Sequence, residues 1–272
     1  MLPDRQQSRA GFRPIGSVVH ACQILEAIAA AGGPLGVNEL ARRVGLDPSS
    51  VSRLVRTMEH HRLLERETAT NRVNLGMGLV LLASGVLHGL DVRSAAGFEL
   101  DRLSRETRET INLGVWDLDS ALIVDHRAGL EPIAALGWVG RRDPAHATSL
   151  GKALLAFQPE PVVRAIVDGS PKRFTPTTIT GRAALTTALD EIRRRGYAVN
   201  RGEMRTELHA VAAPVFGLGD VVVAAIGIAG PASRFTESRI EELADAVRDA
   251  ALIVSRALGA SPAATAPGVR AS

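Results

Sequence analysis

The sequence predicts an α+β protein in which a small helical domain precedes a larger domain built on an antiparallel sheet. Three observations lead to this prediction. Helical apolar periodicity fills the first quarter of the chain, strand-like alternation with hairpin signals marks the second half, and the net charge is confined to the first quarter. With 272 residues, the chain is long enough for two compact domains.

The composition is that of a folded protein with an aliphatic core. Apolar residues make up 46% of the chain and charged residues 22%, whereas aromatic residues contribute only 3%. The single cysteine, Cys22, cannot form a disulfide within the chain, which suits a reducing cytoplasm. The apolar stretch 77–90 is too short to span a bilayer, and the N-terminus lacks a signal-like segment. We therefore expect a cytoplasmic protein with no membrane partner.

The charge is distributed unevenly along the chain. Residues 1–76 contain ten arginines and seven acidic residues, a net charge of +3. Residues 77–272 contain 22 basic and 22 acidic residues and are neutral. A basic segment joined to a neutral one indicates a polyanionic partner for the first segment only.

Two helices are predicted within residues 15–44. In the first, apolar residues recur at helical spacing up to the Gly-Gly-Pro turn at 32–34, namely Val18, Cys22, Leu25 and Ala29. We therefore expect Cys22 to lie in the core of this domain. The second helix, VNELARRV at 37–44, ends at Gly45, which can take the positive φ of a helix C-terminus.

The stretch GLDPSSVSRLVRTM, residues 45–58, predicts a third helix with one polar side. Asp47 is a good N-cap, and Pro48 suits the first helical position because its missing N–H would be unbonded there. The apolar positions i, i+3, i+4 and i+7 predict a buried stripe of Val51, Leu54, Val55 and Met58. Serines and arginines occupy the other positions. The second and third helices are therefore predicted to form a helix-turn-helix.

The segment LLERETATNRVNL, residues 63–75, predicts a two-stranded wing that turns at Thr70-Asn71. A recognition helix with a basic wing is suited to duplex DNA, because serine hydroxyls bond phosphates and arginine forks onto guanine. The predicted partner is double-stranded operator DNA, contacted by Arg42, Arg43, Pro48, Ser49, Ser50, Ser52, Arg53, Arg56, Arg66 and Arg72. The alternative is an ordinary solvated face.

Residues 77–92 predict a connector helix that is apolar on more than one side. Its apolar residues could not all dock on the small winged domain of residues 15–76; they include Leu79, Leu82, Val86 and Leu87. Such a helix bridges domains or pairs with a second copy. A homodimer or homotetramer would also present two DNA-binding modules to two half-sites. The alternative is a helix buried within the second domain.

Residues 93–259 mix helical and strand patterns. Helices are predicted over 98–107, 149–157, 161–169, 182–196 and 236–258, and strands over 111–117, 121–127, 132–140, 197–203, 209–216 and 221–230. The first two strands are joined at 118–120 as a hairpin, which indicates an antiparallel sheet. Residues 260–272, rich in alanine and proline, predict a disordered tail.

These segments together resemble the IclR family of bacterial transcription regulators over residues 15–258. Besides the winged helix-turn-helix, four stretches match that family's motifs in order and spacing: AHATSLGKALLA (145–156), GYAVNRGE (196–203), AVAAPVF (210–216) and AAIGIAGP (224–231). The resemblance implies an operator-binding N-terminal domain, a GAF-like C-terminal effector domain, and dimers or tetramers. The expected function is DNA-binding regulation modulated by a small-molecule effector. The alternative is a second domain that only oligomerises.

The effector pocket of that family can be carried over by position. The resemblance implies contacts from Ala135, Trp138, Val139, Asp143, His146, Thr148, Ser149, Leu150, Asn200, Leu208, Ala210, Gly227 and Ala229. Thr148 and Ser149 open a helix whose free N–H groups favour an anion, so an organic acid or aromatic catabolite is expected. Gly227 and Ala229 leave room, and Leu150 offers an apolar wall.

The sequence gives little sign of catalysis or of metal binding. A direct ligand contact and a structural hydrogen bond both remain open for His146. The sequence contains no G-x-S-x-G elbow, no P-loop and no H-E-x-x-H motif, so we expect no catalytic residues, no metal and no cofactor.

Overall fold

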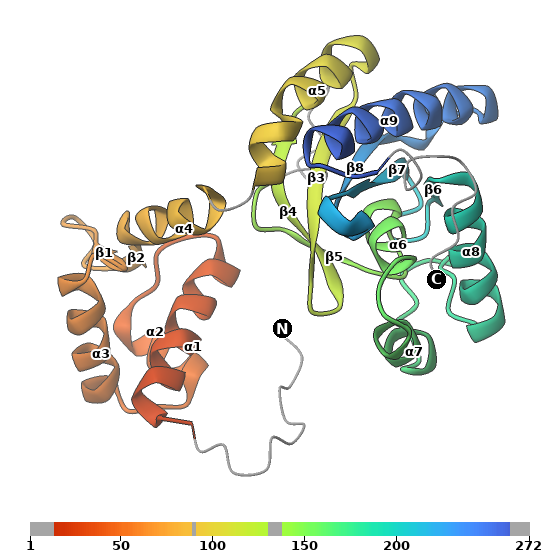
Figure 1. The fold of residues 1–272 in the computed structure, drawn as a ribbon. Helices are drawn as coiled ribbons and strands as arrows, with labels where there is room; N and C mark the ends of the chain where they lie inside the picture. The colour runs from red at the N-terminus through yellow and green to blue at the C-terminus, as the bar shows by residue number, and fades with distance from the viewer. Residues whose placement is uncertain (1–13, 89–90, 130–137, 262–272) are drawn as a thin grey trace. The chain divides into compact units, whose positions relative to one another are not determined.

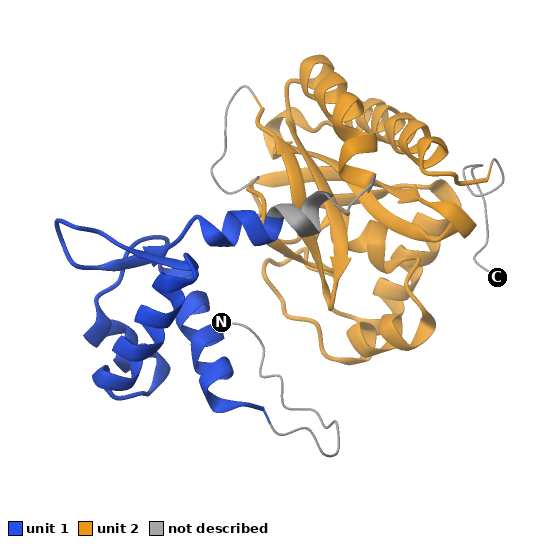
Figure 2. Cartoon of the chain, turned by 60° about the vertical axis from the view of Figure 1, so that its left-hand side comes forward, with its two compact units in different colours: residues 1–89 blue, residues 90–272 orange. Residues whose placement is uncertain are grey.

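The computed structural model describes residues 14–88, 91–129 and 138–261, without the side chains of residues 84–88 and 91. Contacts divide the chain into two compact units, residues 1–89 and 90–272, shown in different colours in Figure 2. Ala135, most of the predicted strand 132–140 and nearly all of the predicted tail lie outside the described residues. Among the described helices, none has the length and apolarity needed to cross a membrane.

The N-terminal unit is a winged helix-turn-helix. Its elements are α1 (Gly16–Ala31), α2 (Val37–Val44), α3 (Pro48–His60), β1 (Leu64–Arg66), β2 (Val73–Leu75) and α4 (Gly78–His88). The wing strands β1 and β2 pair antiparallel, and a bridge from Leu35 to Val73 adds a short third segment. Branched aliphatic side chains from the three first helices and the wing form the core, including Ile24, Ile28, Leu40, Val51, Val55 and Leu64.

The caps of the helix-turn-helix follow from local chemistry. Gly45 ends α2 with a φ of 69°, a left-handed conformation that glycine adopts without steric cost. Asp47 Oδ1 accepts a hydrogen bond from Ser50 N at 2.8 Å and caps α3, with Pro48 at the first position. The structure confirms these predicted caps and the buried residues Val51, Val55 and Met58, whereas Leu54 of the predicted stripe is only half-buried.

The predicted burial of Cys22 is wrong. Cys22 is exposed, and Val18 of the same predicted stripe is 57% exposed. The buried stripe of α1 runs instead through Ile24 and Ile28, one turn apart. Two isoleucines bury more apolar area than cysteine and alanine, so the helix turns their side toward the core.

The C-terminal unit is built on a six-stranded sheet of order β5-β4-β3-β8-β7-β6, in which neighbouring strands are antiparallel. Its strands are β3 (Thr110–Asp117), β4 (Ser120–Arg127), β5 (Arg142–Pro144), β6 (Ala198–Arg201), β7 (Leu208–Phe216) and β8 (Val222–Pro231). Its helices are α5 (Asp91–Thr107), α6 (Ser149–Leu155), α7 (Glu160–Asp168), α8 (Arg182–Arg195) and α9 (Glu237–Ala257), with 3-10 turns η1 (Leu218–Asp220) and η2 (Ala232–Arg234).

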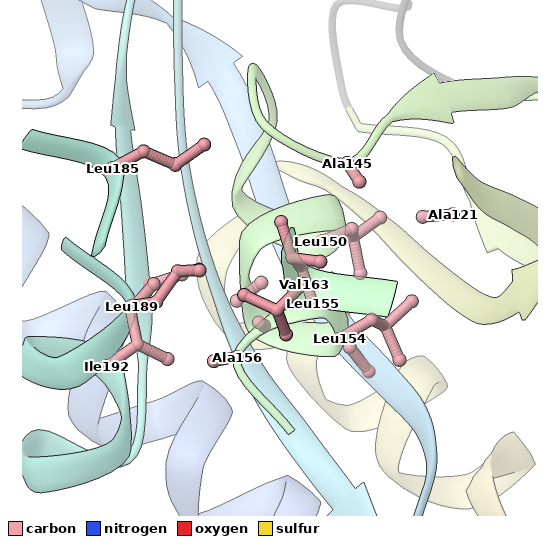
Figure 3. Packing of buried hydrophobic residues seen from close by; sticks show 14 of the residues in the cluster. Ala121, Ala145, Leu150, Leu154, Leu155, Ala156, Val163, Leu185, Leu189 and Ile192 are labelled. Atoms are coloured by element: carbon pink, nitrogen blue, oxygen red, sulfur yellow. The ribbon is translucent and has the colours of Figure 1, made fainter. Parts of the chain in front are cut away.

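Helices cover both faces of this sheet. In Figure 1, α5 and α9 lie along one face, whereas α6, α7 and α8 lie on the other. On the second face, leucines of α6 belong to the same buried cluster as Leu185, Leu189 and Ile192 of α8, which Figure 3 labels. Each fully buried leucine contributes about 2 kcal/mol through its burial. This packing fixes α6 over the sheet.

A hairpin turn and a helix cap of the C-terminal unit are those that the sequence predicts, whereas the start of the tail differs. Leu118 turns the predicted β3–β4 hairpin with a φ of 59°. Thr236 Oγ1 accepts from Arg239 N and caps α9, as predicted. Ser261, placed by the sequence in the tail, is instead held by two hydrogen bonds of 2.8 Å to the Asp220 carboxylate.

Candidate functional site

The outer side of α3 separates polar from apolar residues. Pro48, Ser49, Arg53 and Arg56 are exposed, and Ser50 and Ser52 are half-buried. Val51, Val55 and Met58 on the opposite side are buried in the core of the unit. This helix therefore presents hydroxyl and guanidinium groups to solvent from a fixed backbone.

The predicted DNA-contacting arginines fall into two groups. Arg42, Arg53 and Arg56 are exposed and make no ion pair with any residue that the structure describes. Nothing within the described chain neutralises them. A cation of this kind can meet a phosphate or a base without first leaving a carboxylate.

The second group, Arg43, Arg66 and Arg72, is bound within the unit. Arg43 pairs with Glu39 at 2.8 Å, and Arg72 reaches the same carboxylate at 3.3 Å. Arg72 also donates to the carbonyl of Pro34 at 2.9 Å.

Arg66 ties the wing to the recognition helix. It pairs with Glu59 of α3 at 2.9 Å and donates to the carbonyl of Asn71 at 3.1 Å. Together with Arg72, it connects both strands of the wing to the helix-turn-helix. Arg66 and Arg72 therefore set the position of the wing, whereas the pair of Arg43 with Glu39 lies within α2.

The hydroxyl of Ser49 is also engaged. It donates to Asp47 Oδ1 at 2.6 Å. Hydrogen bonds from the Ser49 and Ser50 side chains, together with the Ser50 backbone N–H, hold the pKa of Asp47 well below its ordinary value. Asp47 therefore stays ionised as the cap of α3, and Ser49 supports that cap.

Helix α4 begins with an exposed apolar surface. Met77, Val80, Leu81 and Leu82 are between 55% and 63% exposed, whereas Leu79 is half-buried. The N-terminal unit thus leaves much of this surface uncovered. Contiguous exposed apolar residues of this kind favour a protein partner.

A cavity of about 300 Å³ lies in the C-terminal unit, between α6 and the sheet. Ten of the thirteen residues expected at the effector pocket line it: Trp138, Asp143, Thr148, Ser149, Leu150, Asn200, Leu208, Ala210, Gly227 and Ala229. Its floor consists of small residues on paired strands, because Ala210 of β7 stands opposite Ala229 of β8. The cavity is large enough for a small organic molecule.

Gly227 allows α6 to approach the floor of the cavity. A Cβ atom at this position would lie 3.0 Å from Leu150 Cγ and 3.3 Å from the carbonyl of Val211. Leu150 therefore occupies the space that a side chain would need. The glycine therefore lets α6 pack closely on the sheet, besides leaving space in the cavity.

Two polar residues of the cavity form hydrogen bonds with the backbone that encloses it. Thr148 caps α6 by accepting from Gly151 N at 3.0 Å, and it donates to the carbonyl of Pro144 at 3.1 Å. Asn200 donates to the carbonyl of Ala147 at 2.6 Å and accepts from Glu203 N at 3.0 Å. The buried hydroxyl of Ser149 has no hydrogen-bond partner among the described residues.

Charged pairs surround the cavity. Arg141 forks onto Asp143 with two contacts of 2.8 Å, and its guanidinium lies 5.6 Å from the centre of the Trp138 ring. Arg142 pairs with Asp117 and lies 3.6 Å from Asp119. The charge of Asp143 is therefore neutralised by Arg141, and the residue forms part of the cavity wall without offering a free charge.

A buried ion pair adjoins the cavity. Lys152, one turn after Ser149 on α6, contacts Glu203 Oε2 at 2.6 Å and the carbonyl of Val199 at 2.9 Å. Burial is the main cause that lowers the pKa of Lys152, and the Glu203 carboxylate opposes it. The pair fastens α6 to the loop between β6 and β7.

Two expected residues, His146 and Val139, do not line the cavity, and a third cannot be placed because it lies outside the described residues. His146 is buried, donates from Nε2 to the carbonyl of Lys172 at 2.8 Å and stacks on Phe174. This geometry is that of a structural hydrogen bond. Val139 is 45% exposed and is absent from the described lining, and Ala135 lies outside the described residues.

Sequence reasoning missed several residues of the lining: Asn112, Arg141, Arg142, Met204, Arg205, His209 and Ile228. Asn112 stands opposite Gly227 because β3 pairs with β8, strands far apart in the sequence. Met204 and Arg205 follow Gly202, whose φ of 74° turns the loop. That glycine lies inside the predicted strand 197–203, whereas the observed strand β6 ends before it at Arg201.

A winged helix-turn-helix joined to a cavity-bearing antiparallel domain defines a DNA-binding transcription regulator. Two family models match the chain, the IclR helix-turn-helix domain over residues 17–68 and the bacterial transcriptional regulator IclR C-terminal domain over 84–256. The chain belongs to the IclR family, and its antiparallel domain is of the GAF-like kind.

Relatives across most of the chain carry regulator names. The chain is 32% identical over 246 residues to the HTH-type transcriptional regulator KdgR of Escherichia coli K12, covering 90% of this chain and 93% of KdgR. It is 32% identical over 260 residues to the transcriptional repressor AllR of Klebsiella pneumoniae, covering 95% and 96%. These relatives are named as regulators, not as enzymes.

Solved structures agree with this assignment. The Thermotoga maritima IclR matches with a TM-score of 0.76 and 30% identity, over 90% of this chain and 99% of that one. An IclR homologue from Microbacterium hydrocarbonoxydans, complexed with 4-hydroxybenzoate, matches with a TM-score of 0.81 and 28% identity, over 90% and 100%.

Proposed function

We propose that this regulator binds operator DNA through α3 and that a small organic acid in the C-terminal cavity changes its operator affinity. The observation that carries the DNA-binding part is the set of exposed arginines Arg42, Arg53 and Arg56, which no described carboxylate neutralises. Arg53 and Arg56 extend from the outer side of α3. In a major groove they can fork onto guanine or bond phosphates.

The remaining polar residues of this unit divide between contact and support. Ser52 can donate to phosphate oxygens beside the groove, the Ser50 hydroxyl can do so only by leaving Asp47, and Pro48 shapes the start of the helix. Ser49 supports the Asp47 cap. The ion pairs of Arg66 and Arg72 position the wing, and that of Arg43 lies within α2. These three arginines reach DNA only by exchanging a carboxylate for a phosphate.

The protein acts as a homodimer or a pair of such dimers. The exposed apolar residues of α4 provide a surface that a second copy would bury. Two copies present two recognition helices to two half-sites, which multiplies operator affinity and specificity.

The effector proposal is supported by the chemistry of the cavity. Small residues on the floor and Leu150, Leu208 and Trp138 on the walls accept an apolar body of limited size. The Ser149 hydroxyl can bond an acid group at the start of α6. The homologue complexed with 4-hydroxybenzoate supports an organic acid or an aromatic catabolite as the ligand class. A ligand that binds one arrangement of the dimer better than the other shifts the population and hence the operator affinity.

The alternative is a second domain that only oligomerises. Thermal-shift screening of the full-length protein against organic acids distinguishes the two. A metabolite at 100 times its Kd adds about 2.7 kcal/mol of stability. If no acid in the library raises the unfolding temperature, the effector proposal fails and oligomerisation remains.

The DNA-binding part is tested on duplexes selected by the wild-type protein from a random-sequence pool. Replacing Arg53 or Arg56 with alanine should weaken binding in gel-shift titrations while leaving the oligomeric state unchanged. Affinity that stays within about twofold for both variants would contradict the assignment of α3 as the recognition helix.

A further inference from the structure

We infer that Arg205, in the loop between β6 and β7, supplies the positive charge that holds the acid group of the effector. The cavity would then select anionic ligands through this loop. The inference rests on the proposed effector function and goes beyond it by naming the residue that decides the ligand class.

The positive charges around the cavity are not all balanced by carboxylates. Three arginines line it, and two of them face carboxylates: Arg141 forks onto Asp143, and Arg142 pairs with Asp117. Arg205 makes no ion pair with any residue in the described part of the chain. The one carboxylate in the described lining is Asp143, which Arg141 already neutralises. The cavity therefore carries an uncompensated positive charge at Arg205.

The second argument is that other donors are occupied or uncharged. Thr148 donates its one hydroxyl hydrogen to a backbone carbonyl at 3.1 Å, and Asn200 donates one of its two amide hydrogens to another at 2.6 Å, so these two residues leave at most one neutral N–H for a ligand. Ser149 retains a neutral hydroxyl. Helix α6 spans only Ser149–Leu155, so its dipole is that of a very short helix. His209 of the lining also has a buried Nδ1 without a hydrogen-bond partner and can add a further hydrogen bond, but Arg205 is the one arginine of the described lining that no carboxylate neutralises.

The loop that carries Arg205 is anchored. Gly202 donates to the carbonyl of Leu208 at 3.1 Å, and Leu208 N donates to the carbonyl of Arg205 at 3.1 Å, which closes the loop on itself. Gly202 has a φ of 74°, and a Cβ there would lie 3.1 Å from Thr206 Cα. Only glycine suits this turn.

The base of the same loop is fixed to its surroundings. Glu203 is held by the buried ammonium group of Lys152, and its carbonyl accepts from Thr178 Oγ1 at 2.6 Å. The backbone of Arg205 is thus set by its neighbours, and only its exposed side chain has to be ordered. Less conformational entropy is lost when such a residue closes on a ligand.

The ligand class follows from these features. Arginine binds a carboxylate with two parallel charge-assisted hydrogen bonds, and lysine cannot reproduce that fork. The apolar walls at Leu150, Leu208 and Trp138 suit a short aliphatic chain or one aromatic ring. We therefore expect monocarboxylic acids of this size to bind, and their uncharged amides to be rejected.

The experiment uses the full-length protein and a thermal-shift library of aliphatic and aromatic monocarboxylic acids, 4-hydroxybenzoate included, with the matching primary amides. Acids that raise the unfolding temperature are then titrated by calorimetry into wild type, Arg205→Gln, Arg205→Lys and Arg256→Gln. Arg256 is an exposed arginine of α9 that does not line the cavity, so its variant controls for the loss of one positive charge.

The expected result is that acids bind and amides do not, and that Arg205→Gln lowers acid affinity about tenfold or more. Arg205→Lys should recover part of that loss, and Arg256→Gln should bind as wild type does. Acid affinity unchanged in Arg205→Gln would overturn the inference while leaving the effector function standing. Wild-type protein that binds no acid would contradict the proposed function itself.

Discussion

The two units of this regulator use arginine in different ways. On the N-terminal unit, Arg42, Arg53 and Arg56 are exposed without a described carboxylate partner. In the described C-terminal unit, most arginines are ion-paired, as Arg141 and Arg142 are beside the cavity. The unpaired arginines of α2 and α3 can bind an anion without breaking an ion pair, whereas the paired ones beside the cavity hold its walls together.

The largest expected effect comes from breaking the buried pair Lys152–Glu203 of the C-terminal unit. Lys152→Met leaves the Glu203 carboxylate buried without its cation, so unfolding free energy should fall by about 3–5 kcal/mol in urea denaturation. The double variant Lys152→Met with Glu203→Leu should recover most of that loss, because no unpaired charge remains.

The matched control is the exposed pair Arg164–Glu160, whose side chains are 66% and 63% exposed. Arg164→Met should cost less than about 1 kcal/mol, since solvent screens this pair. Equal losses at the buried and exposed pairs would mean that the Lys152–Glu203 contact does not stabilise the fold.

Arginines of the first group should dominate DNA binding. Arg53→Ala should reduce affinity for a selected duplex by about 1–3 kcal/mol if it contacts a base, and Arg42→Ala should lower the salt dependence by about one phosphate contact. Fluorescence anisotropy over a series of salt concentrations measures both. A salt dependence that neither variant changes would indicate that this face does not meet DNA.

Arginines of the second group should matter less and differently. Arg66→Ala removes a positioning contact to Glu59, so we expect a loss of only a fewfold in affinity, on the order of 0.5–1 kcal/mol. The same anisotropy assay compares it with Arg53→Ala. A larger effect for Arg66→Ala than for Arg53→Ala would reverse the division into contacting and positioning arginines.

The smallest expected effect concerns the pH dependence of the α3 cap. Because the pKa of Asp47 is depressed in the folded state, its contribution is fully present above the unfolded value of about 3.9. That contribution is lost as the pH falls through the folded value. Asp47→Asn keeps a cap that does not titrate.

Thermal unfolding of wild type and Asp47→Asn between pH 7 and pH 2.5 measures the difference. The advantage of the wild-type protein should be constant above about pH 4 and shrink below it. A constant difference down to the lowest pH would show that Asp47 is not the titrating cap.

Local features of the fold were predictable from the sequence, and long-range ones were not. The caps at Asp47 and Thr236 and the stripe through Val51 depend on neighbours within a few residues, so spacing alone predicted them. Cys22 was misplaced because periodicity left two adjacent faces of α1 open, and only packing against α2 and α3 chose between them.

Positions carried over from the family resemblance account for ten of the residues that line the cavity, and their contact with an effector stays a prediction. Asn112 and Arg205 were missed because they join the cavity through strand pairing and a loop turn that no local pattern specifies. Which arginines form ion pairs could not be predicted either, because Glu39 and Arg72 lie far apart in the sequence and meet only in the folded unit. Counting charges predicted the net positive charge of the N-terminal unit but not which of its arginines lack an ion pair.

The most direct test of the account is the affinity for a selected operator duplex with and without a saturating acid that binds the cavity. The account predicts a change of about fivefold or more in wild type, the usual range of coupling between two sites. It also predicts that the change disappears in Arg205→Gln at the same acid concentration, while affinity without acid is kept. An operator affinity that is the same with and without bound acid would contradict the proposed coupling.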